Sequence, residues 1–437
     1  DKLIHTSNLY YNVPAIEAAK KVVEASGLKK AFFTNSGAEA IEGALKMAKR
    51  YAYDRDKNSD HEVIAMNHSF HGRTMGALAL TGNSHYQEPF GPMISGIKFA
   101  EFNNLDSVKA LINEKTCAII VEPVQGEGGI YPATKEFMEG IRKICDDNDI
   151  IMICDEIQCG MGRTGKMYAF QHYNVKPDII TTAKALGCGV PVGAFVAGEK
   201  CCDSLVPGDH GTTYGGNPFA AAAINAVFDQ FEKLQIPEHA KEIGTYLWDK
   251  LEELKEKHDC ITGHRGIALM QGLEFNADHP VGDIVKKALE KGLIIISAGN
   301  NVIRFVPPLV IEKEKMERAK EICNDGSILE IKPLQPKKAA ILTTGSEVYH
   351  GRIQDKFTPV LVEKLKEYGS EVIFHEIYDD DNEAITKGCL SAIEQGAELV
   401  LCTGGMSVDP DDKTPLAIKN TGARIVSYGA PVLPGAM

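Results

Sequence analysis

The stretch that most constrains this 437-residue sequence lies between residues 149 and 187. Two short apolar runs in it, 149–154 and 179–182, are too brief for helices and rich in β-branched residues, which is typical of buried strands in a parallel sheet. Asp155 follows the first run, and Lys184 follows the second. Because ligands bind beyond the carboxyl ends of the strands in open α/β sheets, we expect this acid and this amine to share one crevice.

Either residue alone carries little information. A single lysine is more often a solvated surface charge, and an aspartate after a strand is more often a helix cap or a turn residue. The pair is more informative, since an acid and an amine at two strand ends suit the two ends of a flat cofactor. Pyridoxal phosphate needs a lysine for its Schiff base and an aspartate that keeps the ring nitrogen protonated.

Three motifs in this stretch extend the pair: Asp155-Glu-Ile-Gln158, Gly162-Arg-Thr-Gly165 and Thr182-Ala-Lys184-Ala-Leu-Gly187. Together they resemble the class III pyridoxal-phosphate aminotransferases, especially the acetylornithine and ornithine aminotransferases. The resemblance runs from about residue 3 to about residue 320. It implies an α/β protein of fold type I, in which a large parallel-sheet domain is followed by a small α+β domain. It also implies that Lys184 is both the Schiff-base lysine and the proton carrier, and that Asp155 contacts the ring nitrogen of the cofactor.

The resemblance also identifies a phosphate site near residue 36. Ser36 and Glu39 form a capping box, which by pattern alone indicates only a helix start. A helix N-terminus exposes backbone N–H groups that suit a phosphate. In the family, the positions of Ser36, Gly37 and Ala38 hold the cofactor phosphate.

Further site residues follow from the resemblance. Phe70 follows a predicted strand at 63–66, where an aromatic is usually a core residue, and the family stacks it on the pyridine ring. Gln158 is a further cofactor-binding position. In the loop that starts at Glu122, two carboxylates near glycines suggest a metal site, but no His or Cys accompanies them. The family instead makes the second of them, Glu127, the gating partner of a substrate arginine.

That arginine is Arg304, which stands in an otherwise apolar run before two prolines. A buried arginine requires a carboxylate or a ligand to satisfy it. The resemblance assigns it to the α-carboxylate of the amino acid, which a guanidinium binds in a bidentate way that lysine cannot reproduce.

Thr213 lies in a glycine-rich loop, for which a turn is the default interpretation. Similar enzymes use this position to reach the cofactor phosphate of the neighbouring subunit, which implies a homodimer with shared active sites.

The sequence predicts four segments: a cofactor-binding large domain at 1–235 that lacks the family's N-terminal segment, a small domain at 236–323, a linker at 324–338, and a last domain at 339–437. Two prolines mark the linker. Beyond it, apolar runs and helical patterns alternate as a βαβαβ unit with its own small parallel sheet.

The loops of this last domain resemble those of the molybdopterin-binding domain of molybdenum-cofactor biosynthesis proteins, without that family's later Gly-Leu-Pro-Gly element. A Thr403-Gly-Gly turn can form an anion-binding nest, and Asp355, Asp409 and Asp412 could hold Mg²⁺ through oxygen ligands. The alternative is that these aspartates are helix caps and solvated charges.

Composition excludes several kinds of partner. A net charge of −13 disfavours nucleic acid and anionic membranes. The eleven cysteines show no Cys-x-x-Cys spacing, which indicates a reduced, cytoplasmic setting. No apolar stretch reaches transmembrane length.

These observations predict a transaminase of the acetylornithine/ornithine type, which transfers an amino group to 2-oxoglutarate in arginine metabolism and carries an appended molybdopterin-binding-like domain. N-acetylornithine, N-succinylornithine, ornithine and 4-aminobutyrate are all possible donors. The alternative is a pterin-binding protein of molybdenum-cofactor biosynthesis whose aminotransferase half is a vestigial scaffold.

Overall fold

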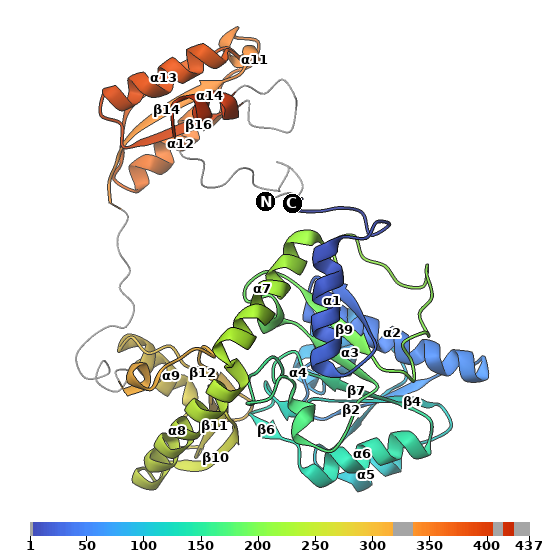
Figure 1. Ribbon diagram of the computed structural model, residues 1–437. Coiled ribbons are helices and arrows are strands. Elements are labelled where there is room, and N and C mark those ends of the chain that lie inside the picture. Colours follow the sequence, from blue (N-terminus) through green and yellow to red (C-terminus); the bar gives the residue numbers. More distant parts are fainter. Residues whose placement is uncertain (1–2, 318–334, 405–413, 424–437) are drawn as a thin grey trace. The chain divides into compact units, whose positions relative to one another are not determined.

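A computed structural model describes residues 3–317, 335–404 and 414–423 of the chain. The chain divides into two compact units, Asp1–Leu329 and Glu330–Met437 (Figure 1). Each unit has its own sheet and its own apolar core.

The first unit is built on a seven-stranded sheet. Most neighbouring strands are parallel, and β9 is antiparallel to both of its neighbours. In spatial order the strands are β1 (Lys30–Thr34), β9 (Gly193–Ala197), β8 (Ile179–Thr182), β7 (Ile151–Asp155), β4 (Thr116–Val121), β2 (Glu62–Met66) and β3 (Ile97–Ala100). The large parallel-sheet domain expected from the sequence is thereby confirmed.

Helices cover both faces of this sheet (Figure 1). Successive residues of a strand point to opposite faces, so Ile119 and Met152 join one core while Ile120 and Ile153 join the other. Both faces being buried, the central strands are apolar throughout instead of alternating with polar residues. The helices of the unit are α1 (Val13–Ser26), α2 (Gly37–Asp56), α3 (Met75–Leu80), α4 (Ser84–Gln87), α5 (Leu105–Leu111), α6 (Lys135–Asp147), α7 (Pro218–Leu234), α8 (Ile236–Lys257) and α9 (Val281–Glu290).

A smaller antiparallel sheet follows α8. Its strands are β10 (Ile261–Ile267), β11 (Met270–Phe275), β13 (Val302–Phe305) and β12 (Ile296–Ala298), in that spatial order. A two-stranded ribbon, β5 (Val124–Gln125) and β6 (Tyr131–Pro132), lies in the loop that carries Glu127. Within the described residues of the unit there are also three short 3₁₀ helices: η1 (Glu88–Phe90), η2 (Ala169–His172) and η3 (Lys184–Leu186).

The second unit is a three-stranded parallel sheet with β14 in the centre. Its elements are β14 (Lys338–Thr344), α11 (Ser346–Tyr349), α12 (Phe357–Glu367), β15 (Glu371–Tyr378), α13 (Asn382–Glu394), β16 (Leu399–Thr403) and α14 (Thr414–Asn420). The expected βαβαβ order is confirmed.

Among the described residues, none of the helices has the length and apolar character needed to cross a membrane.

Candidate active site

The register between β7 and β8 brings the acid and the amine together. Asp155 is the last residue of β7 and pairs with Thr181 of the parallel strand β8. Lys184 lies three residues further on, at the start of η3, with a left-handed backbone (φ 48°). A non-glycine residue in this conformation costs about 1–2 kcal/mol and is retained only where the surroundings fix it.

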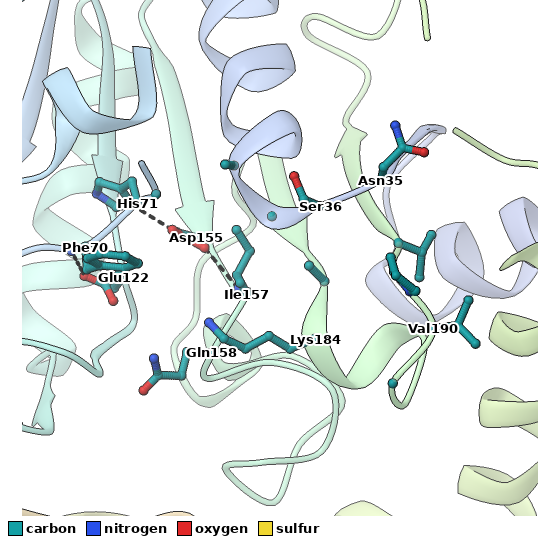
Figure 2. Close-up of a pocket in the computed structure, with 17 residues that line it drawn as sticks. Asn35, Ser36, Phe70, His71, Glu122, Asp155, Ile157, Gln158, Lys184 and Val190 are labelled. Carbon is teal, nitrogen blue, oxygen red and sulfur yellow. Dashed lines mark hydrogen bonds and ion pairs between the residues drawn. The ribbon is translucent and has the colours of Figure 1, made fainter. Parts of the chain in front are cut away.

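Asp155 is nearly fully buried, and both of its oxygens have partners. One oxygen accepts hydrogen bonds from the Ile157 N–H (3.0 Å) and the Thr181 hydroxyl (3.1 Å), and the other lies 2.7 Å from Nδ1 of His71 (Figure 2). Burial opposes a charged imidazole, but the hydrogen bond and the negative charge of Asp155 outweigh it and raise the pKa of His71. The carboxylate is therefore held rigidly at the base of the site.

A cavity of about 550 Å³ opens above this carboxylate, and the Lys184 side chain extends into it (Figure 2). Phe70 and Ile157 flank the carboxylate. The remaining lining comes from the α2 N-terminus, the loop after η3 and the segments that follow β2, β4, β7 and β8: Asn35, Ser36, Gly37, Ala38, His71, Gly72, Glu122, Gln158, Ala183, Gly189, Val190, Pro191 and Val192. The structure thus brings together nearly every residue that the sequence predicted for the cofactor.

The predicted helix start at residue 36 is confirmed, with one difference in the capping. The Ser36 hydroxyl accepts a hydrogen bond from the Glu39 N–H (3.3 Å), as in a capping box. The Glu39 carboxylate, however, accepts from the N–H of Asn35 (2.8 Å) instead of that of Ser36. The first N–H groups of a helix have no intrahelical acceptor, so the backbone at Gly37 and Ala38 offers donors to the cavity.

Glu122 is a residue of this cavity to which the sequence analysis gave no role. Its buried carboxylate accepts hydrogen bonds from the N–H of Phe70 (3.1 Å) and of Gly126 (3.3 Å). Burial raises its pKa to about 7. The sequence pattern around Glu122 suggested only a weak metal site, and His71 had no signal of its own, because only the convergence of β2, β4 and β7 places the two beside Asp155.

Arg304, Glu127 and Gln158 form one polar cluster. The Arg304 guanidinium donates to a Glu127 carboxylate oxygen (2.6 Å) and to the Gln158 side-chain oxygen (2.8 Å), while the Gln158 amide donates to Glu127 (3.1 Å). Burial by itself would raise the pKa of Glu127, but Arg304 and Gln158 outweigh it and lower that pKa. Nε of Arg304 is buried without a hydrogen-bond partner among the described residues. Its N–H group is therefore available to donate a hydrogen bond to a ligand.

Thr213 does not line the Lys184 cavity. It lies in a separate hollow of about 360 Å³ with Glu39, Tyr214 and neighbouring residues, and Asn35 lines both spaces. Its predicted role in a neighbouring subunit stays a prediction.

In the second unit, Asp355 behaves as a helix-capping residue. One of its oxygens accepts hydrogen bonds from the N–H groups of Phe357 (2.9 Å) and Thr358 (3.1 Å) at the start of α12, and the other accepts from the Thr343 hydroxyl (3.4 Å). Asp409 and Asp412 lie outside the described residues. Within the described ranges, no group of three His, Cys, Asp or Glu side chains is arranged to hold a metal ion.

The chain belongs to the class III aminotransferases. Residues 1–325 match the family described as "Aminotransferase class-III", and residues 340–436 match the "Probable molybdopterin binding domain".

Among individual relatives, the acetylornithine aminotransferase of Methanocaldococcus jannaschii is 50% identical over 319 residues, which are 72% of this chain and 79% of the relative. The acetylornithine aminotransferase of Clostridium acetobutylicum is 48% identical over 319 residues, which are 73% of this chain and 82% of the relative. Of solved structures, ornithine aminotransferase from Toxoplasma gondii ME49 superimposes with a TM-score of 0.71 at 31% identity, covering 74% of this chain and 78% of that one. N-acetylornithine aminotransferase from Stenotrophomonas maltophilia K279a superimposes with a TM-score of 0.64 at 33% sequence identity. The match covers 74% of this chain and 82% of that one.

The residues around the cavity fit pyridoxal phosphate. The start of α2 would supply donors for the phosphate, Lys184 an amine for the aldehyde, Asp155 an acceptor for the ring N–H, and Phe70 a flat face for the ring. These four groups line one cavity whose volume lies in the range of small-molecule sites.

Proposed function

We propose that this protein is a pyridoxal-phosphate-dependent transaminase that moves an amino group from an ornithine-type amine, N-acetylornithine foremost, to 2-oxoglutarate. The observation that carries the proposal is the enclosure of Lys184, Asp155 and the α2 N-terminus by one cavity. The names of the relatives support N-acetylornithine as the donor.

Lys184 has two tasks in this proposal. Pyridoxal phosphate, when bound, supplies a carbonyl carbon for the amino group and a ring that takes up electrons. Lys184 would hold the cofactor through its amino group and, when the incoming amine takes its place, that amino group would move a proton away from the amino-bearing carbon of the substrate. Asp155 would hold the proton on the ring nitrogen, and His71 keeps the carboxylate in place.

Arg304 receives the substrate carboxylate. Its pairing with Glu127 supports a gate, in which Glu127 leaves the guanidinium when a carboxylate enters and covers it otherwise. Arg304→Lys removes the bidentate fit and should raise KM for both substrates by about tenfold, the effect of one lost charge-assisted hydrogen bond. Steady-state kinetics decide this role, because a change confined to kcat would assign Arg304 elsewhere.

We further propose a homodimer with shared active sites. The N-terminal segment lies along the loop before α7, where Asn8 donates to the Thr212 carbonyl (2.7 Å) and Phe219 N–H to the Ile4 carbonyl (3.3 Å). This region exposes large apolar side chains, including Leu9, Tyr11, Tyr214 and Phe219. Such a surface favours a partner.

The dimer has a direct test. If Thr213 completes the cofactor site of the neighbouring subunit, mixing Thr213→Ala and Lys184→Ala chains should restore part of the activity that each variant lacks alone. Hybrid dimers are verified by mass spectrometry under native conditions. Verified hybrids without activity would count against shared sites.

For the second unit we propose binding of a molybdopterin-like pterin phosphate, with Mg²⁺ held by Asp355 and by Asp409 and Asp412. The match of residues 340–436 to a probable molybdopterin binding domain supports this. Calorimetry of the full-length chain with a pterin phosphate, with and without Mg²⁺, should show Mg²⁺-dependent heat. An Asp355→Asn variant is the matched control.

The transaminase assignment itself is tested by a donor panel. Purified protein is supplied with 2-oxoglutarate and one of N-acetylornithine, N-succinylornithine, ornithine or 4-aminobutyrate, and glutamate is measured. We expect the highest kcat/KM with N-acetylornithine. Absence of glutamate with every donor, from protein that carries the cofactor, would overturn the assignment.

A further inference from the structure

Arg163 is a partly buried cation that the chemistry described so far does not use. It belongs to the loop between β7 and η2 and is flanked by Gly162 (φ 79°) and Gly165 (φ 82°), whose left-handed backbones shape the loop. A Cβ on Gly165 would lie 3.0 Å from Cβ of Lys241 in α8, so the loop packs closely against that helix.

The Arg163 side chain makes specific contacts with the smaller sheet. One guanidinium nitrogen, Nη1, donates to the backbone carbonyls of Leu269 (3.1 Å) and Pro307 (2.5 Å). The Arg163 carbonyl in turn accepts a hydrogen bond from the Leu269 N–H (3.3 Å). The loop is thus bonded to the β10–β11 turn and to the segment after β13.

This arrangement is costly, because Arg163 makes no ion pair with any carboxylate in the described part of the chain. Burial alone lowers its pKa to about 10. A buried charge without a counter-ion contributes less to stability than an apolar side chain of similar size. The contacts of Arg163 are therefore better explained by where they hold the backbone than by the stability that they add.

The backbone that Arg163 holds is the support of Arg304. Pro307 lies three residues after Arg304, just beyond β13. Leu269 immediately precedes β11, and Gly272 of that strand pairs directly with Arg304. Five residues before Arg163, the Gln158 side chain contacts the Arg304 guanidinium itself. One loop therefore contacts both the guanidinium of Arg304 and, at one end of the β11–β13 pair, the backbone next to each of the two strands.

We propose that Arg163 is a positioning residue that fixes Arg304 relative to Gln158 and Glu127 and thereby sets the affinity for the substrate carboxylate. The proposal rests on the proposed function of Arg304. A lysine at position 163 has a shorter reach, so it keeps the charge but does not bring its nitrogen to the two carbonyls that Nη1 of Arg163 contacts.

The test compares Arg163→Gln and Arg163→Lys with Arg142→Lys. Arg142 is a matched control: it is also partly buried, and it contacts the Lys176 carbonyl (3.1 Å) and the Asp178 carboxylate (3.0 Å), which lie in the segment before β8 and not in the smaller sheet. We expect Arg163→Gln to raise KM for 2-oxoglutarate and for N-acetylornithine about tenfold, as for one lost charge-assisted hydrogen bond, with kcat changed less than about twofold. Arg163→Lys should give a smaller rise.

A second readout does not depend on turnover. Glutarate has the two carboxylates of 2-oxoglutarate but no carbonyl group that could react, so its Kd from calorimetry reports carboxylate binding alone. This Kd should rise with KM in the Arg163 variants and stay at the wild-type value in Arg142→Lys, although the control lowers the melting temperature.

The outcomes separate the two proposals. Unchanged KM and glutarate Kd in Arg163→Lys, with a lowered melting temperature or kcat, would show that Arg163 is only structural. This variant keeps the charge and decides the matter even where Arg163→Gln does not fold. If Arg304→Lys also leaves KM unchanged, the role of Arg304 fails instead, and the proposal for Arg163 falls with it.

Discussion

Asp155 shows how one side chain acquires its properties from its neighbours. Three donors, from Ile157, Thr181 and His71, fix its two oxygens in a buried position. Asp155→Asn keeps the shape but removes the charge that holds the ring proton. We expect kcat to fall about tenfold to a hundredfold, the range for a lost charge-assisted hydrogen bond. Cofactor binding, measured by absorption, should persist, and unchanged activity would mean that the acid is only structural.

Glu122 predicts a pH dependence of stability. Its pKa of about 7 lies above the ordinary value of 4.5, so the folded protein binds a proton that the unfolded chain has released. Its contribution to stability is therefore full below about pH 4.5 and is lost as the pH rises through about 7, by on the order of 3 kcal/mol. Urea unfolding of Glu122→Gln should show a shallower decline over this window than wild type. Buried Glu156 and His71 titrate in the same direction, so the comparison uses the difference between the two proteins.

The control for that measurement is Glu114→Gln, a substitution at an exposed position, which should leave the wild-type slope unchanged. A slope for Glu122→Gln equal to that of wild type would place the titrating group elsewhere.

At the scale of single elements, α2 depends on a close approach to β9. Gly43 of α2 faces Phe195 of β9, and a Cβ on it would lie 2.2 Å from that ring. Gly43→Ala should lower the free energy of unfolding by about 1–3 kcal/mol, as overpacking of a core does.

The matched control is Gly282→Ala in α9, because nothing lies within 4 Å of a Cβ built at Gly282. It should leave stability unchanged or raise it by up to about 1 kcal/mol, through helix propensity. Chemical unfolding distinguishes the two, and equal effects would contradict this account of the packing.

The elements also show where sequence patterns suffice. The runs at 63–66, 149–154 and 179–182 were predictable because strands buried on both faces are continuously apolar. The strand β9 was not predicted, because its flanking glycines and prolines read as a loose loop. The hairpin of β10 and β11, with its turn at 268–269, was not predicted either. The three glycines at positions 263, 266 and 272 weaken its strand pattern.

The candidate site was likewise predictable only where its residues lie at the ends of elements with a clear sequence pattern. Lys184, Asp155 and the start of α2 were predictable, since each lies at the end of an element with a clear pattern. The pairing of Arg304 with Glu127 brings together residues 177 positions apart, and only the family resemblance suggested it. The contacts of Arg163 with Leu269 and Pro307 leave no trace in periodicity or composition, because they are made to backbone carbonyls.

At the scale of the whole molecule, the two compact units predict separable activities. Every residue of the candidate active site lies in the first unit, and each unit has its own core. Ending the chain near Pro336 should therefore leave cofactor binding and kcat/KM within about twofold of the full-length values. The check is the absorption spectrum and turnover of the shortened protein. A folded fragment that no longer binds the cofactor would contradict the separation.

The central claim is that Lys184 holds pyridoxal phosphate in the cavity beside Asp155, and one experiment addresses it directly. Purified protein is loaded with pyridoxal phosphate, reduced with borohydride, digested and analysed by mass spectrometry, with Lys184→Ala treated in parallel. We predict one pyridoxyl group on the peptide that contains Lys184 in the wild-type protein, and none at a defined position in the variant, which should also lack visible absorption and turnover. A pyridoxyl group on another lysine of the wild type, or retained transamination by Lys184→Ala, would contradict the account.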